Sequence, residues 1–199
     1  MKLMKADDNS LKKAAGILDK GGVIIYPTDT LYGLGADAAN ERAKKRIYEI
    51  KGRDFDKPLS ICVSSLSQAE KFAKVDGTAW LLAEKFLPGP LTLVLEQQKE
   101  LKYISKDGKI AVRIPENIFA IRLAEMRGRA FTSTSANLSG GKNPVSVGDI
   151  PDEVKDKCDL VVDGGISKFM KTSTVLDVSE RKIIREGAIT REELKEFLG

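Results

Sequence analysis

Residues 23–35 read VIIYPTDTLYGLG, and this stretch combines a strand with a candidate binding segment. The run from Val23 to Tyr26 is β-branched and aromatic, which predicts a buried strand that ends at Pro27. The polar residues that follow lie beside Gly33 and Gly35, where the backbone lets a ligand approach closely. The same hydroxyls suit a turn that satisfies its own backbone, so this segment alone leaves ligand binding open.

Helices and strands alternate irregularly on both sides of this strand. Upstream, Ser10 is expected to cap a helix that ends at Gly21, and downstream Asn40 is expected to cap one that ends at Gly52. Apolar patterns predict strands at 59–63, 91–96, 110–114, 130–133, 160–162, 174–178 and 182–185, and helices at 67–74, 78–87, 117–127 and after a Thr190–Glu193 capping box. No strict βαβ repeat appears, which favours an α/β fold with a twisted mixed sheet, partly antiparallel and flanked by helices, over a Rossmann fold.

Two of these helices allow predictions about which side chains face the core. In the helix at 117–127, the inward positions are expected to be Ile118, Ile121, Leu123 and Ala124. In the helix after Asn40, the apolar stripe leaves an opposite, basic face, which is expected to be solvated and consists of Lys44, Lys45 and Arg46.

Composition restricts the class of protein before any motif is considered. The chain has 199 residues, of which 42% are hydrophobic and 31% charged, so residues 1–199 are expected to form a single soluble domain. It contains no histidine, which excludes a Ser-His triad and a His-ligated zinc site. Its two cysteines, Cys62 and Cys158, form no C-x-x-C pair, and the longest apolar runs are too short to span a membrane. These features predict a cytoplasmic protein.

A basic stretch runs from Arg42 to Lys57, with seven basic and three acidic side chains. Lys51, Arg53 and Lys57 flank the helix end that is expected at Gly52. A helix C-terminus carries partial negative charge, so a phosphate bound here would have to be held by side chains. The alternative is that Lys51 and Arg53 simply complement the helix dipole.

Polar residues also gather where later strands end. Residues 132–139 read TSTSANLS, with five hydroxyls and one amide, which suits nucleoside or amino-acid recognition but also an ordinary surface loop. Arg113 alternates with its apolar neighbours and so faces the opposite side of its strand. Ser173 and Arg185 stand at strand ends, and Cys62 lies in an apolar strand as a small hydrophobic residue.

Seven motifs occur in the order found in the YrdC-like threonylcarbamoyl-AMP synthases, which this chain resembles from about Gly21 to Gly187. They are PTDTLYGL at 27–34, KGR at 51–53 followed by KPL at 57–59, PGPLT at 88–92, VRIP at 112–115, SANLSG at 135–140, STV at 173–175 and REG at 185–187. Each motif is weak alone, but the ordered set is specific. The resemblance is to the short, single-domain form of the family.

The resemblance implies that L-threonine, bicarbonate and ATP react to give threonylcarbamoyl-AMP and pyrophosphate. Partner transferase proteins would then pass the activated group to an adenosine beside the anticodon of tRNA. The resemblance implies ATP contacts at Lys51, Arg53, Lys57, Ser135, Asn137, Asn143 and Arg185. It implies threonine contacts at Thr30, Tyr32, Arg113 and Ser173, and it leaves a contact at Cys62 in question because the family often has histidine there.

The implied reaction agrees with the residue types present. A carbamate formed from the threonine amine and bicarbonate is itself a nucleophile, so the site needs positioning and charge neutralisation more than a protein nucleophile. Mg²⁺ is expected to bridge phosphate oxygens with few protein ligands, and Asp29 is the one candidate ligand. The basic surface also allows direct contact with RNA.

Two other functions fit part of the sequence. A non-catalytic RNA-binding module would show salt-sensitive RNA binding and no ATP turnover. An adenylyl transferase that uses carbamoyl phosphate, similar to the related domain of hydrogenase maturation proteins, would not need threonine.

Overall fold

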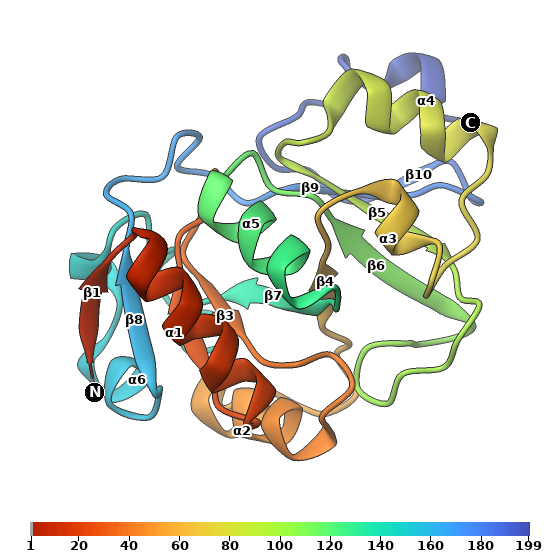
Figure 1. Cartoon of the computed structure of the whole chain (residues 1–199). Helices are drawn as coiled ribbons and strands as arrows, with labels where there is room; N and C mark the ends of the chain where they lie inside the picture. The colour runs from red at the N-terminus through yellow and green to blue at the C-terminus, as the bar shows by residue number, and fades with distance from the viewer. Residues whose placement is uncertain (1) are drawn as a thin grey trace.

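The computed structural model describes residues 2–199, and its strands form one ten-stranded sheet (Figure 1). The strands are β1 (Leu3–Lys5), β2 (Ile24–Tyr26), β3 (Gly33–Gly35), β4 (Ser60–Cys62), β5 (Leu91–Glu96), β6 (Lys109–Arg113), β7 (Phe131–Ser135), β8 (Leu160–Asp163), β9 (Thr174–Asp177) and β10 (Lys182–Arg185). Their order across the sheet is β1-β8-β2-β3-β7-β4-β6-β5-β9-β10. Parallel and antiparallel neighbours are interspersed, so the predicted mixed, partly antiparallel sheet is confirmed.

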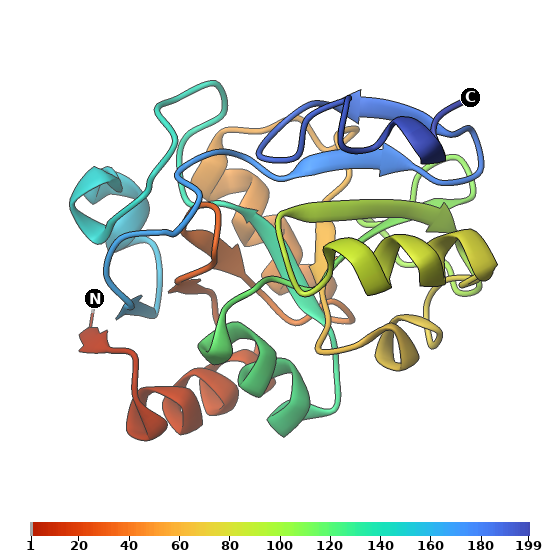
Figure 2. The ribbon, with the colours of Figure 1, turned by 90° about the horizontal axis from the view of Figure 1, so that it is seen from above.

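Helices cover both faces of this sheet. They are α1 (Asp8–Asp19), α2 (Glu41–Lys51), α3 (Leu66–Ala69), α4 (Gly77–Phe86), α5 (Ile118–Arg127) and α6 (Asp152–Asp156), with 3₁₀ turns at Val147–Asp149 and Lys195–Phe197. The apolar sides of α2, α3 and α4 pack into the larger core, whereas α1 and α5 lie side by side over a smaller one (Figure 2). No helix within residues 2–199 has the length and apolar character needed to cross a bilayer.

The pair of helices α1 and α5 covers only part of its face of the sheet. Cys62 and Phe131 are buried beneath these helices in the smaller core. Ser60 and Ser133 lie two positions away along the same two strands, on the same face, and line a pocket instead. The uncovered part of this face is where ligands have access.

The ends of two helices test the capping predictions. Asn40 caps α2, because its Oδ1 accepts a hydrogen bond from the Ala43 N–H at 3.0 Å, and Gly52 ends it with φ +55°. Both predictions are confirmed. The prediction for α1 was wrong, since Asp7 is the cap and Ser10 is the third helical residue, and the two form a reciprocal capping box.

Two predicted helices are shorter than their patterns suggested. After Ala69 the chain leaves α3, because Lys74 N–H donates to the Glu96 carbonyl at the end of β5 instead of continuing the helix. Near the C-terminus, Thr190 and Glu193 form the predicted capping box, but only the 3₁₀ turn at Lys195–Phe197 follows it. A short, mostly charged segment buries too little apolar surface to stabilise an α-helix.

Two predictions about buried faces were also wrong. Ile118 is 71% exposed, and Phe119 points into the core in its place, because the cap at Asn117 starts the helix with Ile118 on the outer side. Lys44 is only 1% exposed and is not part of a solvated face. Burial lowers the pKa of Lys44, while the negative charges of Glu41 and Asp37 act in the opposite direction.

Candidate functional site

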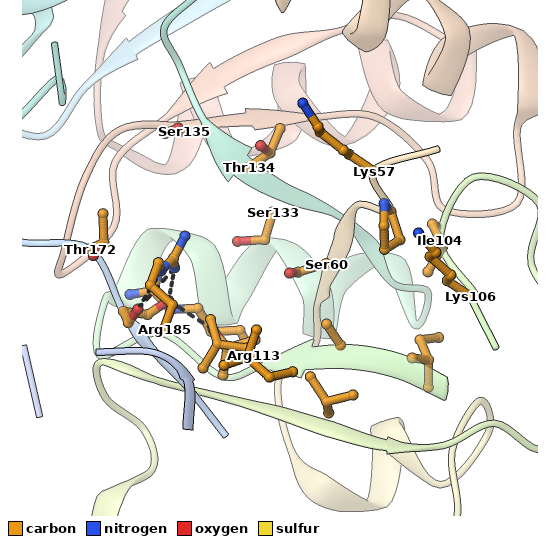
Figure 3. A pocket seen from close by; sticks show the side chains of 18 of the residues that line it. Lys57, Ser60, Ile104, Lys106, Arg113, Ser133, Thr134, Ser135, Thr172 and Arg185 are labelled. Atoms are coloured by element: carbon orange, nitrogen blue, oxygen red, sulfur yellow. Dashed lines mark hydrogen bonds between the residues drawn. The ribbon is translucent and has the colours of Figure 1, made fainter. Parts of the chain in front are cut away.

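A pocket of about 710 Å³ lies on the uncovered part of the sheet (Figure 3). Its floor comes from β4, β5, β6, β7 and β9, and its rim comes from β10 and from the segments that follow β2 and α2. Eight of the residues predicted from the sequence line it, namely Thr30, Tyr32, Arg53, Lys57, Arg113, Ser135, Ser173 and Arg185. The fold therefore brings together polar residues that are far apart in the sequence.

Three arginines from three different elements reach this pocket. Arg53 follows α2, Arg113 comes from β6, and Arg185 ends β10. Burial lowers the pKa of Arg185, and the positive charges of Arg113 and Arg53 lower it further. The Nε atoms of Arg53 and Arg113 are buried and have no hydrogen-bond partner among the described residues. Such a set of guanidinium groups is suited to a ligand with several negative oxygens.

Arg113 is held by a buried carboxylate. Its Nη2 donates to Asp29 Oδ1 at 2.6 Å, and the two side chains are 8% and 0% exposed. Asp29 stands just after β2, and its carbonyl accepts a hydrogen bond from the Phe169 N–H at 2.8 Å. Burial raises the pKa of Asp29, although Arg113 acts in the opposite direction. Asp29 thus fixes the direction in which Arg113 enters the pocket.

Arg185 is oriented by the end of the neighbouring strand. Its Nε and Nη2 donate to the Ser173 carbonyl at 3.2 and 2.9 Å, and the Ser173 hydroxyl lies 2.9 Å from the hydroxyl of Thr92. A hydroxyl pair and a guanidinium group therefore lie together on one side of the pocket. This combination can hold a carboxylate or phosphate oxygen together with a polar side chain.

The segment after β2 contributes hydroxyls that are already partly engaged. Thr30 Oγ1 lies 3.1 Å from Thr28 Oγ1 at the pocket wall. The Tyr32 hydroxyl donates to the Gly165 carbonyl at 2.7 Å and accepts from the Gly164 N–H at 3.0 Å. Burial raises the pKa of Tyr32 to about 12. Because its hydroxyl is hydrogen-bonded to the 164–165 segment, Tyr32 contributes to the pocket as a wall residue.

Lys51 and Asn137 lie outside the pocket lining and shape the loop that carries Ser135. Lys51 Nζ donates to the Ser135 carbonyl, to the Asn137 carbonyl at 2.9 Å and to Asn137 Oδ1 at 3.1 Å. The Asn137 amide donates onward to the carbonyls of Gly141 and Lys142. In this structure Lys51 therefore acts on the pocket through the loop at 135–142.

Two further predicted residues also lie outside the lining. Asn143 is exposed on the segment after that loop. Cys62 is fully buried beneath α1 and α5, and burial raises the pKa of its thiol to about 12. The thiol is therefore a neutral packing group, as the sequence suggested for a small hydrophobic residue in a strand.

Lys51 is expected to make stability depend on pH above neutrality. Burial and the nearby Arg53 lower its pKa from the ordinary 10.5 to about 7. Between these two values the unfolded chain binds a proton that the folded protein does not, so the free energy of unfolding rises with pH. Urea unfolding at pH 6, 7, 8 and 9 should show wild type gaining stability over Lys51→Met above pH 7. The exposed Lys45 serves as control through Lys45→Met, and a Lys51→Met difference that stays constant with pH would contradict the assignment.

Asp29, the candidate metal ligand, forms an ion pair instead. Asp29 is paired with Arg113, and within residues 2–199 no group of three or more Asp, Glu, Cys or His side chains is placed to hold a metal ion.

Sequence reasoning missed some of the polar lining. Ser60 and Ser133 face each other across the β4–β7 pairing and point toward the arginines in Figure 3. The signal was present, because Ser133 alternates with Ser135 along one strand and so shares its face. The signal was not used because the strand was predicted to end at Ser133, whereas it continues to Ser135.

Known proteins resemble this chain in sequence and in fold. The Sua5/YciO/YrdC family model, described as telomere recombination, matches residues 16–187. A protein of Methanocaldococcus jannaschii is 40% identical, in an alignment that covers 98% of this chain and 95% of the relative. The threonylcarbamoyl-AMP synthase of Pyrococcus abyssi is 36% identical, and the alignment covers 98% of this chain but 59% of that protein.

A solved structure extends the comparison to the fold. The crystal structure of P. abyssi Sua5 complexed with L-threonine is 35% identical, with a TM-score of 0.93, and the superposition covers 100% of this chain and 61% of that one. The chain thus spans about three fifths of the Pyrococcus protein and nearly all of the Methanocaldococcus one. The ordered motifs, their arrangement around one pocket and these similarities lead to one conclusion: the chain belongs to the Sua5/YciO/YrdC family.

Proposed function

We propose that the protein is an L-threonylcarbamoyl-AMP synthase, which converts L-threonine, bicarbonate and ATP into threonylcarbamoyl-AMP and pyrophosphate. The observation that carries the proposal is the convergence of Arg53, Arg113 and Arg185 on one pocket, with two buried Nε–H groups that have no partner among the described residues. A triphosphate and an amino-acid carboxylate are ligands that such a pocket would neutralise. The L-threonine complex of the P. abyssi relative supports the amino acid.

The reaction divides into two balanced steps. The threonine amine attacks the carbon of bicarbonate, and water leaves as the carbamate forms. A carbamate oxygen then attacks the α-phosphorus of ATP, and pyrophosphate leaves with the electron pair of the broken P–O bond. Negative charge accumulates on phosphate oxygens in the second step, so fixed cations lower its barrier without any protein nucleophile.

The residues divide between the two substrates in this proposal. Arg53 and Lys57, which lie on the segment after α2, hold the phosphates together with Arg185. Threonine lies between Thr30, Arg113 and Ser173, with Tyr32 as a wall. Lys51 and Asn137 keep Ser135 in place from behind. Mg²⁺ bound to ATP would supply additional charge neutralisation on the phosphates beside Arg53, Lys57 and Arg185.

The product indicates the surroundings in which the protein works. Threonylcarbamoyl-AMP is a mixed anhydride, so a transferase that delivers the group to tRNA must consume it. Such a transferase is the downstream partner that we propose, in the cytoplasm. The free thiols of Cys62 and Cys158 are compatible with a reducing compartment.

Pyrophosphate release from ATP tests the proposal and separates it from its rivals. We expect release to require both threonine and bicarbonate. Serine lacks the threonine methyl group, which is worth roughly 1 kcal/mol, so it should react about fivefold less efficiently if the pocket packs against that methyl. Equal release without any amino acid would remove threonine from the mechanism. Release that depends on carbamoyl phosphate would favour the related adenylyl transferase, and RNA binding without ATP turnover would favour a binding module.

A further inference from the structure

The segment at 53–58, which carries Arg53 and Lys57 into the pocket, has few contacts of its own. Asp54, Phe55, Asp56 and Lys57 are all exposed. Within the segment, the Lys57 N–H donates to the Asp54 carbonyl at 3.3 Å, and Arg53 Nη2 donates to the Pro58 carbonyl at 3.2 Å. Lys57 Nζ also lies 3.2 Å from Asp54 Oδ2, but this ion pair is exposed and contributes little. Exposed backbone with so few internal hydrogen bonds is ordered mainly by what anchors it from outside.

Tyr48, in the last turn of α2, supplies that anchor. Its side chain is buried, and its hydroxyl lies 2.8 Å from the Lys57 carbonyl and 3.0 Å from the Tyr103 carbonyl. Its own carbonyl accepts a hydrogen bond from the Arg53 N–H at 3.1 Å. Arg53 and Lys57, the first and fifth residues after Gly52, are therefore both tied through their backbone to one tyrosine.

The same hydroxyl joins two walls of the pocket. The Tyr103 carbonyl also accepts from the Leu59 N–H at 3.0 Å, and Lys106 Nζ donates to the Asp56 carbonyl at 3.2 Å. The Tyr48 ring packs on Phe55 and Tyr103, with centroids 4.8 and 5.6 Å away. Burial raises the pKa of Tyr48 to about 12, so the hydroxyl keeps its proton at neutral pH.

We propose that Tyr48 is a positioning residue for the nucleotide: its hydroxyl holds the 53–58 segment against the Tyr103 segment, so that Arg53 and Lys57 point into the pocket before ATP arrives. This inference rests on the proposed function. Tyr48 is not part of the pocket lining and acts through the two basic residues, so its effect should fall on ATP and not on threonine. Pre-ordering this segment removes an entropic cost that binding would otherwise bear.

The test is Tyr48→Phe, which keeps the ring packing and removes only the hydroxyl. The variant lacks the hydroxyl that donates to the Lys57 and Tyr103 carbonyls. The KM for ATP should therefore rise about fivefold to tenfold. The kcat should change less than about threefold, and the KM for threonine should not change. Tyr103→Phe is the matched control, since it removes a hydroxyl from the same aromatic cluster that makes no hydrogen bond among the described residues. It should leave both KM values at their wild-type levels.

A second readout does not depend on turnover. Hydrogen–deuterium exchange of the protein without ligands should be faster at residues 53–57 in Tyr48→Phe than in wild type or Tyr103→Phe. Wild-type exchange there together with an unchanged KM for ATP would overturn the role of Tyr48. Parallel losses of ATP and threonine affinity with a lower Tm would also overturn it, in favour of a general packing role. If wild type binds no ATP while exchange changes as expected, the anchor stands and the proposed function fails.

Discussion

Arg53→Ala is expected to lower pyrophosphate release by roughly 10²- to 10³-fold, the scale of losing one preorganised charge-stabilising donor. Arg53 reaches the pocket from the segment after Gly52, and its buried Nε has no partner among the described residues. A guanidinium group holds two phosphate oxygens at once, so Arg53→Lys should recover only part of the loss. ATP affinity should weaken, while threonine affinity measured without ATP should stay near that of wild type.

Steady-state kinetics and urea unfolding together check this expectation. The free energy of unfolding should fall by less than about 1 kcal/mol, because Arg53 is only half-buried and its one side-chain hydrogen bond is local. Arg46→Ala is the control, since Arg46 lies on α2, the helix that precedes Arg53, and pairs with Asp159 outside the pocket. An Arg53→Ala protein that keeps full turnover, or fails to fold, would show that Arg53 serves only the helix end.

Arg113→Ala is expected to reduce both stability and threonine binding. The change leaves the fully buried Asp29 carboxylate without its partner, which typically costs about 3–5 kcal/mol of unfolding free energy. Burial already raises the pKa of Asp29, and loss of Arg113 raises it further. In the variant the folded state then binds the proton more tightly than the unfolded chain, so the deficit should be largest at pH 7 and shrink as the pH falls.

Urea unfolding at pH 5 and pH 7 measures this deficit. Arg122→Ala is the matched control, because Arg122 pairs with Asp8 on the surface and its loss should cost less than about 1 kcal/mol. The double variant Asp29→Leu with Arg113→Met removes both charges, so it should regain stability without regaining threonine binding. Equal losses in Arg113→Ala and Arg122→Ala would mean that the Asp29–Arg113 pair contributes no more than a surface pair.

Elements set by local chemistry were predictable from the sequence. The limits of β5, at Leu91 and Glu96, follow from a continuous apolar run between a Pro-Gly-Pro turn and polar residues. The ends of α2 follow from the capping chemistry of Asn40 and Gly52. By contrast, β1 carries no signal of its own: Leu3 is in a strand because Val161 pairs with it from the distant part of the chain.

The same contrast between local chemistry and tertiary structure applies to the residues of the site. The resemblance to the family, and not residue type alone, grouped Arg53, Arg113, Ser173 and Arg185, and all four line one pocket. Residue type did not distinguish Arg53 from Lys51, two positions away, since only the three-dimensional path of the loop at 135–142 gives Lys51 its partners. Tyr48 gave no signal in the sequence either, because it is an aromatic residue inside a stretch whose pattern is one of basic charge.

The position of β8 has a consequence for how the protein is made. β8 lies between β1 and β2 and pairs parallel with both, yet it follows them by more than a hundred residues. Until the ribosome releases residues 160–163, the apolar edge of β2 has no neighbour on that side and can pair with other chains. β9 and β10, which bring Ser173 and Arg185, emerge later still. The pocket therefore cannot be complete until nearly the whole chain has emerged, and folding is expected to be slow and dependent on protection of that open edge.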